Sequence, residues 1–329
     1  MRTSCIQAFL CFICLAAISS CSPTLSVITK TKKVFDDSSA LIHVSTVLGS
    51  DIVIDYGENR VREFRIGFGY DASTELEYRL WMPVNFPSSC LNKLVILTPG
   101  FKSSSAFMIP LAVEIVKQGM PVLMFSMRGD DLNSKLPRGY GIHEIMDLPM
   151  ALWAYQEYFH IKDSLHIALL GSSLGGSLSL HALQEAKNNE FLQKNLNPFV
   201  IHSLLLESYV PNLESAAKQM LTANEYGDLQ KEMAEHKLMF AQIITDSLIH
   251  GISKKTKVLL QWGEHDKLVL FEDRQKAIQQ FLGKFPSLKT VTIKGGTHAL
   301  RVGYPMPAED VISNNTKMAT FLTERMMCK

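Results

Sequence analysis

The sequence predicts an α/β protein with a mostly parallel, doubly wound sheet. Two observations lead to this fold class: short apolar runs recur along the chain, and longer segments with apolar residues at spacings of three and four separate them. Strands that helices cover on both faces show such uninterrupted apolar runs. The expected parallel strands are residues 94–97, 122–125, 165–170, 200–206, 258–262 and 290–293.

An antiparallel edge is expected before these runs. Residues 51–56, 63–69 and 75–82 show the composition of strands and come in close succession. Among the intervening segments, one helix is plain, because apolar side chains recur at helical spacing and form one face. These are Ile145, Leu148, Leu152, Tyr155 and Phe159. The aromatic residues of this helix are therefore expected in the core.

The alternation of strands and helices breaks between Val210 and Lys257. This segment is rich in Met, Ala, Glu and Lys, with helical patterning and no clear strand. An insertion after a strand of a parallel sheet lies at the carboxyl edge, where such sheets bind ligands, so residues 211–256 are predicted as a small helical lid. The alternative is an ordinary crossover with extra helices.

Composition narrows the class of protein. The chain has 329 residues, of which 47% are hydrophobic and 20% charged, enough apolar material for a large core. The formal net charge is +1, and the lysines are dispersed rather than gathered in a basic stripe. These features argue against a nucleic-acid partner.

The first twenty residues have the pattern of an export signal. Arg2 precedes a mostly apolar run at 5–18, which Gln7 interrupts and which is short for a membrane-spanning helix. The run ends in Ile18-Ser19-Ser20-Cys21, which resembles the bacterial lipobox. This predicts a lipid on Cys21 and an envelope lipoprotein anchored to the membrane. The alternative is an ordinary signal, cleaved near Ser20, that releases a soluble protein.

These patterns divide the chain into a signal peptide at 1–20, a polar tether at 21–50, and one domain at 51–329 that includes the lid. After removal of the signal peptide, Cys21, Cys90 and Cys328 remain. If Cys21 is acylated, only Cys90 and Cys328 could pair, and neither has a metal-ligand spacing. We therefore expect no disulfide framework and no structural zinc.

The pentapeptide Gly171-Ser172-Ser173-Leu174-Gly175 joins the run at 165–170 to a helical segment at 178–186. A serine on a sharp turn from strand to helix needs small residues two positions before and two after it, and glycine stands at both. This spacing predicts Ser173 as a nucleophile and leaves Ser172 as the small residue of the turn. The alternative is a helix N-cap without reactivity.

A serine hydroxyl becomes a good nucleophile only when a base takes its proton, and a carboxylate must orient that base. Asp266 follows the strand at 258–262, and His298 follows the last strand after two glycines, which places both at the same sheet edge as Ser173. Asp266 could instead cap a helix near Val269. Glu207 is a competing acid.

His298 is one of ten histidines and could be a structural one. His265, beside Asp266, is expected to have no role in the site. The developing oxyanion needs backbone N–H donors from turns beside the nucleophile. The N–H of Leu174 is one candidate donor. The turn Thr98-Pro99-Gly100-Phe101, at the end of the strand from residue 94, is placed to supply the other through Phe101.

On these residues, the stretch 94–298 resembles the α/β-hydrolase superfamily, most closely its serine aminopeptidase and monoacylglycerol lipase-like members. The order Ser, Asp, His is the one found in that superfamily. Ser126-Met127-Arg128-Gly129-Asp130 resembles the D-x-R-G-x turn of the family. Two positions depart from it: Pro99 stands where a histidine is usual, and Ser126 where an aspartate is usual, so a differently shaped oxyanion loop is expected.

The resemblance implies a serine hydrolase that cleaves a carboxylic ester or thioester of a small acyl-bearing substrate through an acyl-enzyme, with no cofactor and no metal. An apolar lid containing methionines favours an ester over a peptide. Two alternatives stay open. One is a serine aminopeptidase-like amide hydrolase, in which Glu207 or Glu214 grips a free amino terminus. The other is a non-catalytic envelope lipoprotein that uses the scaffold for binding.

Overall fold

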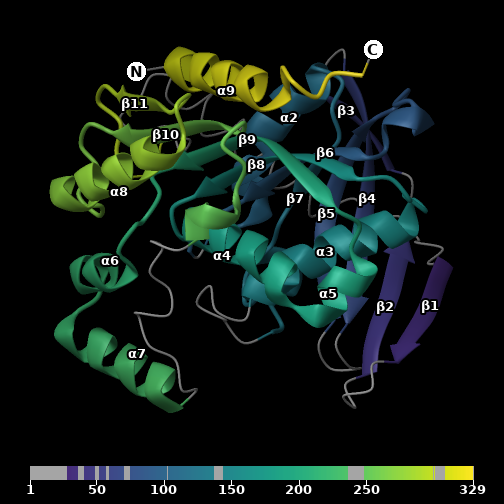
Figure 1. Cartoon of the computed structure of the whole chain (residues 1–329), viewed down its shortest axis with the longest axis horizontal. Coiled ribbons are helices and arrows are strands. Elements are labelled where there is room, and N and C mark those ends of the chain that lie inside the picture. Colours follow the sequence, from purple (N-terminus) through teal and green to yellow (C-terminus); the bar gives the residue numbers. More distant parts are fainter. Residues whose placement is uncertain are drawn as a thin grey trace, which may run out of the picture.

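The computed structural model describes residues 28–35, 41–48, 52–56, 59–69, 75–101, 103–136, 144–235, 248–298, 300 and 308–328. Within these, the chain forms one mixed sheet between two layers of helices (Figure 1). The predicted signal peptide and Cys21 lie outside the described residues.

The sheet confirms the predicted fold class. Its central strands lie in the order β4-β5-β7-β6-β8-β9-β10-β11. From β7 to β11 all neighbours are parallel, whereas β4, β5 and β7 pair antiparallel. The strands are β4 (Asn59–Gly69), β5 (Glu75–Pro83), β6 (Lys93–Thr98), β7 (Val122–Met124), β8 (Leu165–Ser172), β9 (Phe199–Glu207), β10 (Lys257–Gly263) and β11 (Lys289–Ile293).

Helices cover both faces of the sheet. Successive side chains of a strand point to opposite faces, so each buried strand contributes to the core on both sides. In β6, Leu94 and Ile96 pack into one core cluster, and Val95 and Leu97 into the other. The first cluster takes residues of α3 (Glu144–Tyr158), α4 (Leu174–Asn188), α5 (Glu190–Asn195) and α8 (Phe271–Lys284). The second takes residues of α2 (Ile109–Lys117) and α9 (Ala308–Thr323). Single helical turns are η1 (Ser88–Cys90), η2 (Ser105–Met108), η3 (Asp131–Asn133) and η5 (Leu248–Gly251).

The antiparallel edge extends further than the sequence predicts. β1 (Ile28–Phe35) pairs antiparallel with β2 (Leu41–Leu48), and β3 (Ile52–Tyr56) pairs with β4. The first two strands fall in the stretch expected as a tether. The tether was expected from the polarity of residues 29–39, but both strands carry β-branched residues, a composition that suits a strand.

The predicted insertion at 211–256 is helical in its described part. It contains α6 (Leu213–Met220) and α7 (Ala223–Glu235), which stand apart from the two helical layers (Figure 1). Met220, at the end of α6, is 51% exposed. The helical content is confirmed, and the role of these helices as a lid stays a prediction.

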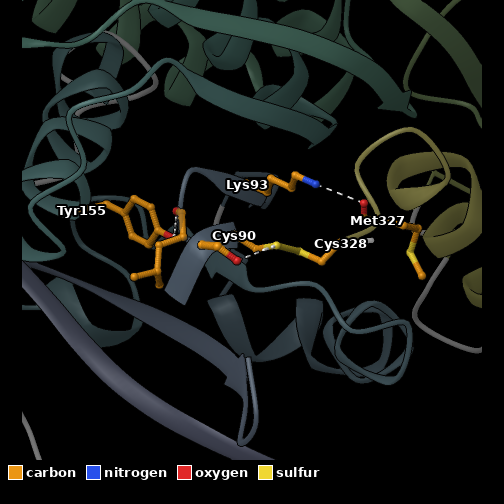
Figure 2. Close-up of a disulfide and its surroundings, with 7 residues drawn as sticks. Cys90, Lys93, Tyr155, Met327 and Cys328 are labelled. Carbon is orange, nitrogen blue, oxygen red and sulfur yellow. Dashed lines mark hydrogen bonds between the residues drawn. A yellow bond between two sulfur atoms is a disulfide. The ribbon is translucent and has the colours of Figure 1, made fainter. Parts of the chain in front are cut away.

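A disulfide joins Cys90 to Cys328 across a sequence separation of 238 residues, with 6.2 Å between the Cα atoms (Figure 2). The prediction that the chain lacks a disulfide framework is therefore wrong for this pair. Spacing along the sequence could not reveal it, because α9 brings the C-terminus back beside the start of β6. There the Lys93 Nζ donates to the Met327 carbonyl at 3.0 Å.

Within the described residues, every helix is too short or too polar to cross a membrane.

Candidate active site

Ser173 occupies the turn between β8 and α4. Its φ of 52° and ψ of −123° lie in a backbone region that residues other than glycine rarely adopt. Two hydrogen bonds fix the turn: the Ser173 N–H donates to the Glu207 carbonyl at 2.8 Å, and the Gly176 N–H donates to the Ser173 carbonyl at 3.0 Å. Ser173 stands at the N-cap position of α4, but its side chain makes no capping hydrogen bond there.

The flanking glycines are required by close approaches of backbone to backbone. A Cβ on Gly171 would lie 2.7 Å from the Gly175 carbonyl oxygen, within the turn itself. A Cβ on Gly175 would collide with the carbonyl oxygens of Thr98 and Pro99, at the end of β6. Gly175 therefore lets the loop after β6 lie directly against the nucleophile turn.

The structure brings the three predicted site residues together. The His298 Nε2 lies 2.7 Å from the Ser173 Oγ, and the His298 Nδ1 lies 2.9 Å from the Asp266 Oδ2. The His298 side chain is 24% exposed, whereas that of Asp266 is fully buried. A neutral imidazole that donates from Nδ1 to the carboxylate presents Nε2 as an acceptor to the serine hydroxyl. This is the geometry of a serine that can lose its proton to histidine.

Asp266 both orients the histidine and organises its own loop. Its second oxygen, Oδ1, accepts the N–H groups of Leu268 at 3.0 Å and Val269 at 3.2 Å. These bonds close a turn ahead of α8, whose N-cap is Leu270, so Asp266 does not cap that helix as the alternative supposed. Because Oδ1 is tied to two backbone donors, Oδ2 stays aimed at the imidazole.

The acid loop and the histidine loop are fastened to each other. The Glu264 Oε2 accepts the Gly295 N–H at 2.9 Å, and the His265 N–H donates to the Gly296 carbonyl at 2.8 Å. A Cβ on Gly263 would collide with the Gly296 carbonyl oxygen, so glycine permits this contact. The sequence predicted the two loops but not Glu264 as a link between them.

Arg274 of α8 is a second residue that no sequence pattern predicted. Its guanidinium donates to the carbonyls of Val269 at 2.8 Å, of Gly263 at 3.2 Å, and of Asp266. It therefore holds the acid loop by its backbone on both sides of the carboxylate. No spacing rule pointed to it, because its acceptors among the described residues are main-chain carbonyls.

The competing candidates do not join the site as acid or base. The imidazole Nδ1 of His298 bonds to Asp266 rather than to Glu207, and Glu207 is 1% exposed. The His265 side chain is 61% exposed and lies 3.8 Å from the Glu264 carboxylate.

The loop after β6 runs beside the nucleophile. A Cβ on Gly100 would lie 3.1 Å from the Ser173 Cβ and 3.6 Å from its Oγ. Phe101 follows Gly100 in this loop, and Leu174 follows Ser173 at the first turn of α4, where backbone N–H groups point away from the helix. Both predicted oxyanion donors thus belong to segments that border Ser173.

In the described part of the chain, no three His, Cys, Asp or Glu side chains are grouped so that they could hold a metal ion.

No protein-family profile matches the chain. Its fold is similar to that of solved esterases. For the esterase Pf2001 of Pyrococcus furiosus, the TM-score is 0.57 with 18% identity, over 85% of this chain and 99% of that one. For a bacterial heroin esterase, the TM-score is 0.53 with 17% identity, over 84% of this chain and 87% of the other.

The chain has the α/β-hydrolase fold. Among curated proteins, this chain is similar to the acylamino-acid-releasing enzymes of Mus musculus and Homo sapiens, at 25% identity over 240 residues. That match covers 70% of this chain but only 31% of those relatives.

Proposed function

We propose that the protein is a serine hydrolase that cleaves esters or thioesters through an acyl-enzyme. One observation carries the proposal: a serine, a histidine and a buried aspartate form an unbroken chain of contacts of 2.7 and 2.9 Å in the loops at one sheet edge. A histidine and aspartate serving only the core would not point toward a serine held at a φ of 52°.

In the proposed reaction, the Ser173 Oγ attacks the acyl carbonyl carbon while its proton passes to the His298 Nε2. Asp266 holds the imidazole tautomer and stabilises the imidazolium that forms. The N–H groups of Phe101 and Leu174 hold the oxyanion. His298 then gives its proton to the leaving alcohol or thiol, and a water deprotonated by the same imidazole hydrolyses the acyl-enzyme, which regenerates Ser173.

An uncharged acyl substrate is favoured over a peptide with a free amino terminus. Of the two acids considered for gripping an amine, Glu207 is buried at 1% exposure. Glu214 is paired with Lys218 at 2.7 Å and accepts from the Tyr226 hydroxyl at 3.1 Å. The hydrogen bond from Lys218, and after it that from Tyr226, lowers the pKa of Glu214. A cation of this chain therefore already occupies the carboxylate that would have to grip a substrate amine.

A second candidate substrate is an N-acylated amino acid amide. It is favoured by the likeness to acylamino-acid-releasing enzymes, whose name implies a blocked amino terminus. A blocked terminus carries no positive charge and needs no acidic partner. This candidate is therefore consistent with the burial of Glu207 and with the pairing of Glu214 with Lys218.

The test is labelling with a fluorophosphonate together with hydrolysis of p-nitrophenyl esters of rising chain length. We expect S173A to lose both labelling and turnover, by at least about 1,000-fold. S172A, at the adjacent serine, is the matched control and should keep both. Labelling of S173A would refute Ser173 as the nucleophile. Rates on an acyl ester, an acylaminoacyl amide and an aminoacyl amide then rank the substrate classes.

We further propose that the protein is exported and tethered to a membrane by a lipid on Cys21. The Cys90–Cys328 disulfide supports export, because such bonds persist in oxidising compartments. The lipid is proposed from the lipobox-like end of the signal, Ile18-Ser19-Ser20-Cys21. Metabolic labelling with a palmitate analogue should mark the wild type but not C21S. If the wild type also lacks label, an ordinary cleaved signal is the better account.

A non-catalytic binding role is the remaining alternative. The orientation of His298 toward Ser173 argues against it. Purified wild-type protein that ignores both the fluorophosphonate and every activated ester would favour it.

A further inference from the structure

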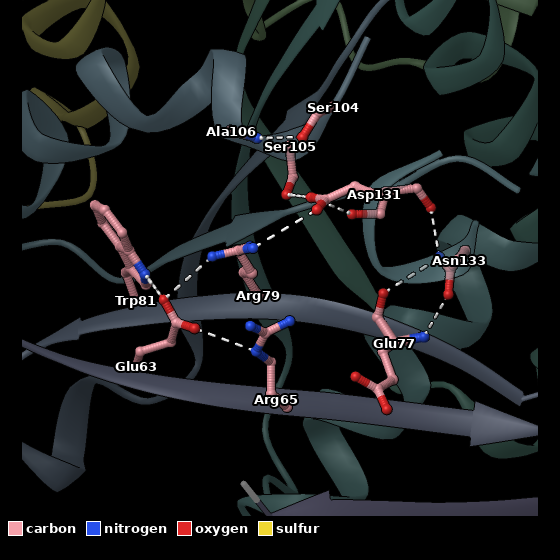
Figure 3. Close-up of polar contacts among 11 residues, drawn as sticks. Glu63, Arg65, Glu77, Arg79, Trp81, Ser104, Ser105, Ala106, Asp131 and Asn133 are labelled. Carbon is pink, nitrogen blue, oxygen red and sulfur yellow. Dashed lines mark hydrogen bonds and ion pairs between the residues drawn. The ribbon is translucent and has the colours of Figure 1, made fainter. Parts of the chain in front are cut away.

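A buried network of alternating charges lies beside the loop that follows β6 (Figure 3). It begins on the antiparallel edge, where Glu63 of β4 accepts from the Trp81 Nε1 at 2.7 Å and from the Arg65 Nε at 3.2 Å. Arg79 of β5 then bridges two carboxylates: its Nη1 lies 3.7 Å from the Glu63 Oε2, and its Nη2 lies 3.6 Å from the Asp131 Oδ1.

The network ends at Asp131, the first residue of η3. Its backbone is left-handed, with a φ of 47°, and its side chain is 15% exposed. The turn is held by the Gly129 N–H, which donates to the Asn133 carbonyl at 2.9 Å, and by the Asn133 side chain, whose Nδ2 donates to the Ser126 carbonyl at 2.8 Å. The surroundings therefore fix both the backbone and the carboxylate of Asp131.

The Asp131 carboxylate reaches the loop after β6. Its Oδ2 accepts a hydrogen bond from Ser105, the first residue of η2, and a longer one from Ser126 at 3.4 Å. Ser105 is fully buried and Ser126 is 1% exposed. Ser126 stands where the resembling family usually has an aspartate, and here the carboxylate beside that position comes from Asp131 instead.

The same loop touches the nucleophile at its other end. We call the segment that links Thr98 to Ser105 the β6–η2 loop. Near its start, Gly100 packs against Ser173, and the Ser103 N–H donates to the Gly100 carbonyl at 3.2 Å. At its end, Ser105 is held by Asp131. Phe101, the proposed oxyanion donor, lies between these two attachments.

We propose that Asp131 is a positioning residue that, held by Arg79, fixes the β6–η2 loop so that the Phe101 N–H meets the oxyanion. The inference rests on the proposed function. A donor that binds only the oxyanion stabilises the transition state and not the bound substrate. Loss of its alignment therefore lowers kcat and leaves KM nearly unchanged.

The test compares D131N with S105A on a p-nitrophenyl ester. D131N removes the charge that Arg79 faces, and S105A removes the hydroxyl but leaves the ion pair. We expect kcat to fall about 10-fold to 100-fold for D131N and about 3-fold to 10-fold for S105A, with KM within about 2-fold. The inhibition constant of a trifluoromethyl ketone, whose serine adduct bears an oxyanion, should rise in parallel with the loss of kcat.

T256V is the matched control for the loss of a buried hydroxyl, because the Thr256 Oγ1 donates to the Ile201 carbonyl at 2.8 Å, away from the turn that holds Asp131. It should lower the melting temperature yet keep kcat and the ketone constant within about 2-fold. S105A decides the question if D131N does not fold.

Unchanged kcat and ketone affinity in a folded D131N or S105A, with an active wild type, would overturn this inference alone. Equal losses in S105A and T256V would also overturn it. A wild type that neither reacts with fluorophosphonate nor turns over esters would overturn the proposed function and this inference together.

Discussion

Single residues set the nucleophile turn, and Gly175 is the most constrained of them. The motif suggested that glycine is needed because the turn is sharp. The structure adds a second reason for Gly175, since its missing side chain leaves room for the carbonyls of Thr98 and Pro99. The same glycine thus sets the distance between Ser173 and the β6–η2 loop.

G175A is therefore expected to impair both activity and stability. The added methyl group must push the β6–η2 loop away, which misplaces the Phe101 donor. We expect kcat/KM to fall at least about 100-fold and the free energy of unfolding to drop by about 2 kcal/mol or more. Ester hydrolysis and urea denaturation measure the two effects.

The control for this substitution is G227A in α7, where a Cβ would meet nothing within 4 Å. It should leave activity intact and stabilise the helix by about 0.5 to 1 kcal/mol. Similar losses in both variants would mean that the contact of Gly175 with the loop is not the cause.

At the scale of elements, the site depends on loops that helices hold from behind. Arg274 extends from the first turns of α8 to the carbonyls of Gly263, Asp266 and Val269. These bonds explain why the Asp266 carboxylate keeps its orientation although it lies in a loop. The helix thus acts on the catalytic geometry without touching a substrate.

R274M should lower kcat by about 10-fold to 100-fold with little change in KM, because the acid loop relaxes and Asp266 no longer fixes the imidazole. R274K keeps the charge but not the planar fork, so it should recover only part of the loss. Steady-state kinetics on an ester give both constants. K276M, at an exposed position of the same helix, is the control, and equal effects in R274M and K276M would contradict the positioning role.

Elements with a strong local pattern could be predicted from the sequence. The buried strands appeared as apolar runs, because burial on both faces leaves a direct mark on composition. The stripe at helical spacing predicted α3, although the structure buries this helix on nearly all sides from Asp147 to Gln156. Ser173 and Asp266 followed because each comes at or shortly after the end of a buried strand, and His298 because two glycines link it to the exposed edge strand β11. Asp131, Glu264 and Arg274 could not be found this way, since they act through loops and main-chain carbonyls that have no fixed spacing.

For the whole molecule, the disulfide shows the same limit. Cys90 lies just before β6 and Cys328 just after α9, so their meeting depends on how the entire chain is wound. The bridge lies at the amino end of β6, whereas the triad lies in loops at the carboxyl ends of β8, β10 and β11. The disulfide and the proposed catalytic residues therefore lie at opposite edges of one sheet.

This separation predicts that loss of the bridge weakens the fold and spares the chemistry. Closing a loop of 238 residues removes much chain entropy from the unfolded state, so the double variant C90S/C328S should lose about 2 to 5 kcal/mol of unfolding free energy. Its kcat/KM should equal that of the wild type below the melting transition, because β6 still holds its loop against Ser173. Calorimetry with and without dithiothreitol, together with ester kinetics at a low temperature, measures both.

Reductant should lower the melting temperature of the wild type and leave that of the variant unchanged. A loss of kcat/KM in the folded variant would show that the two edges of the sheet are coupled.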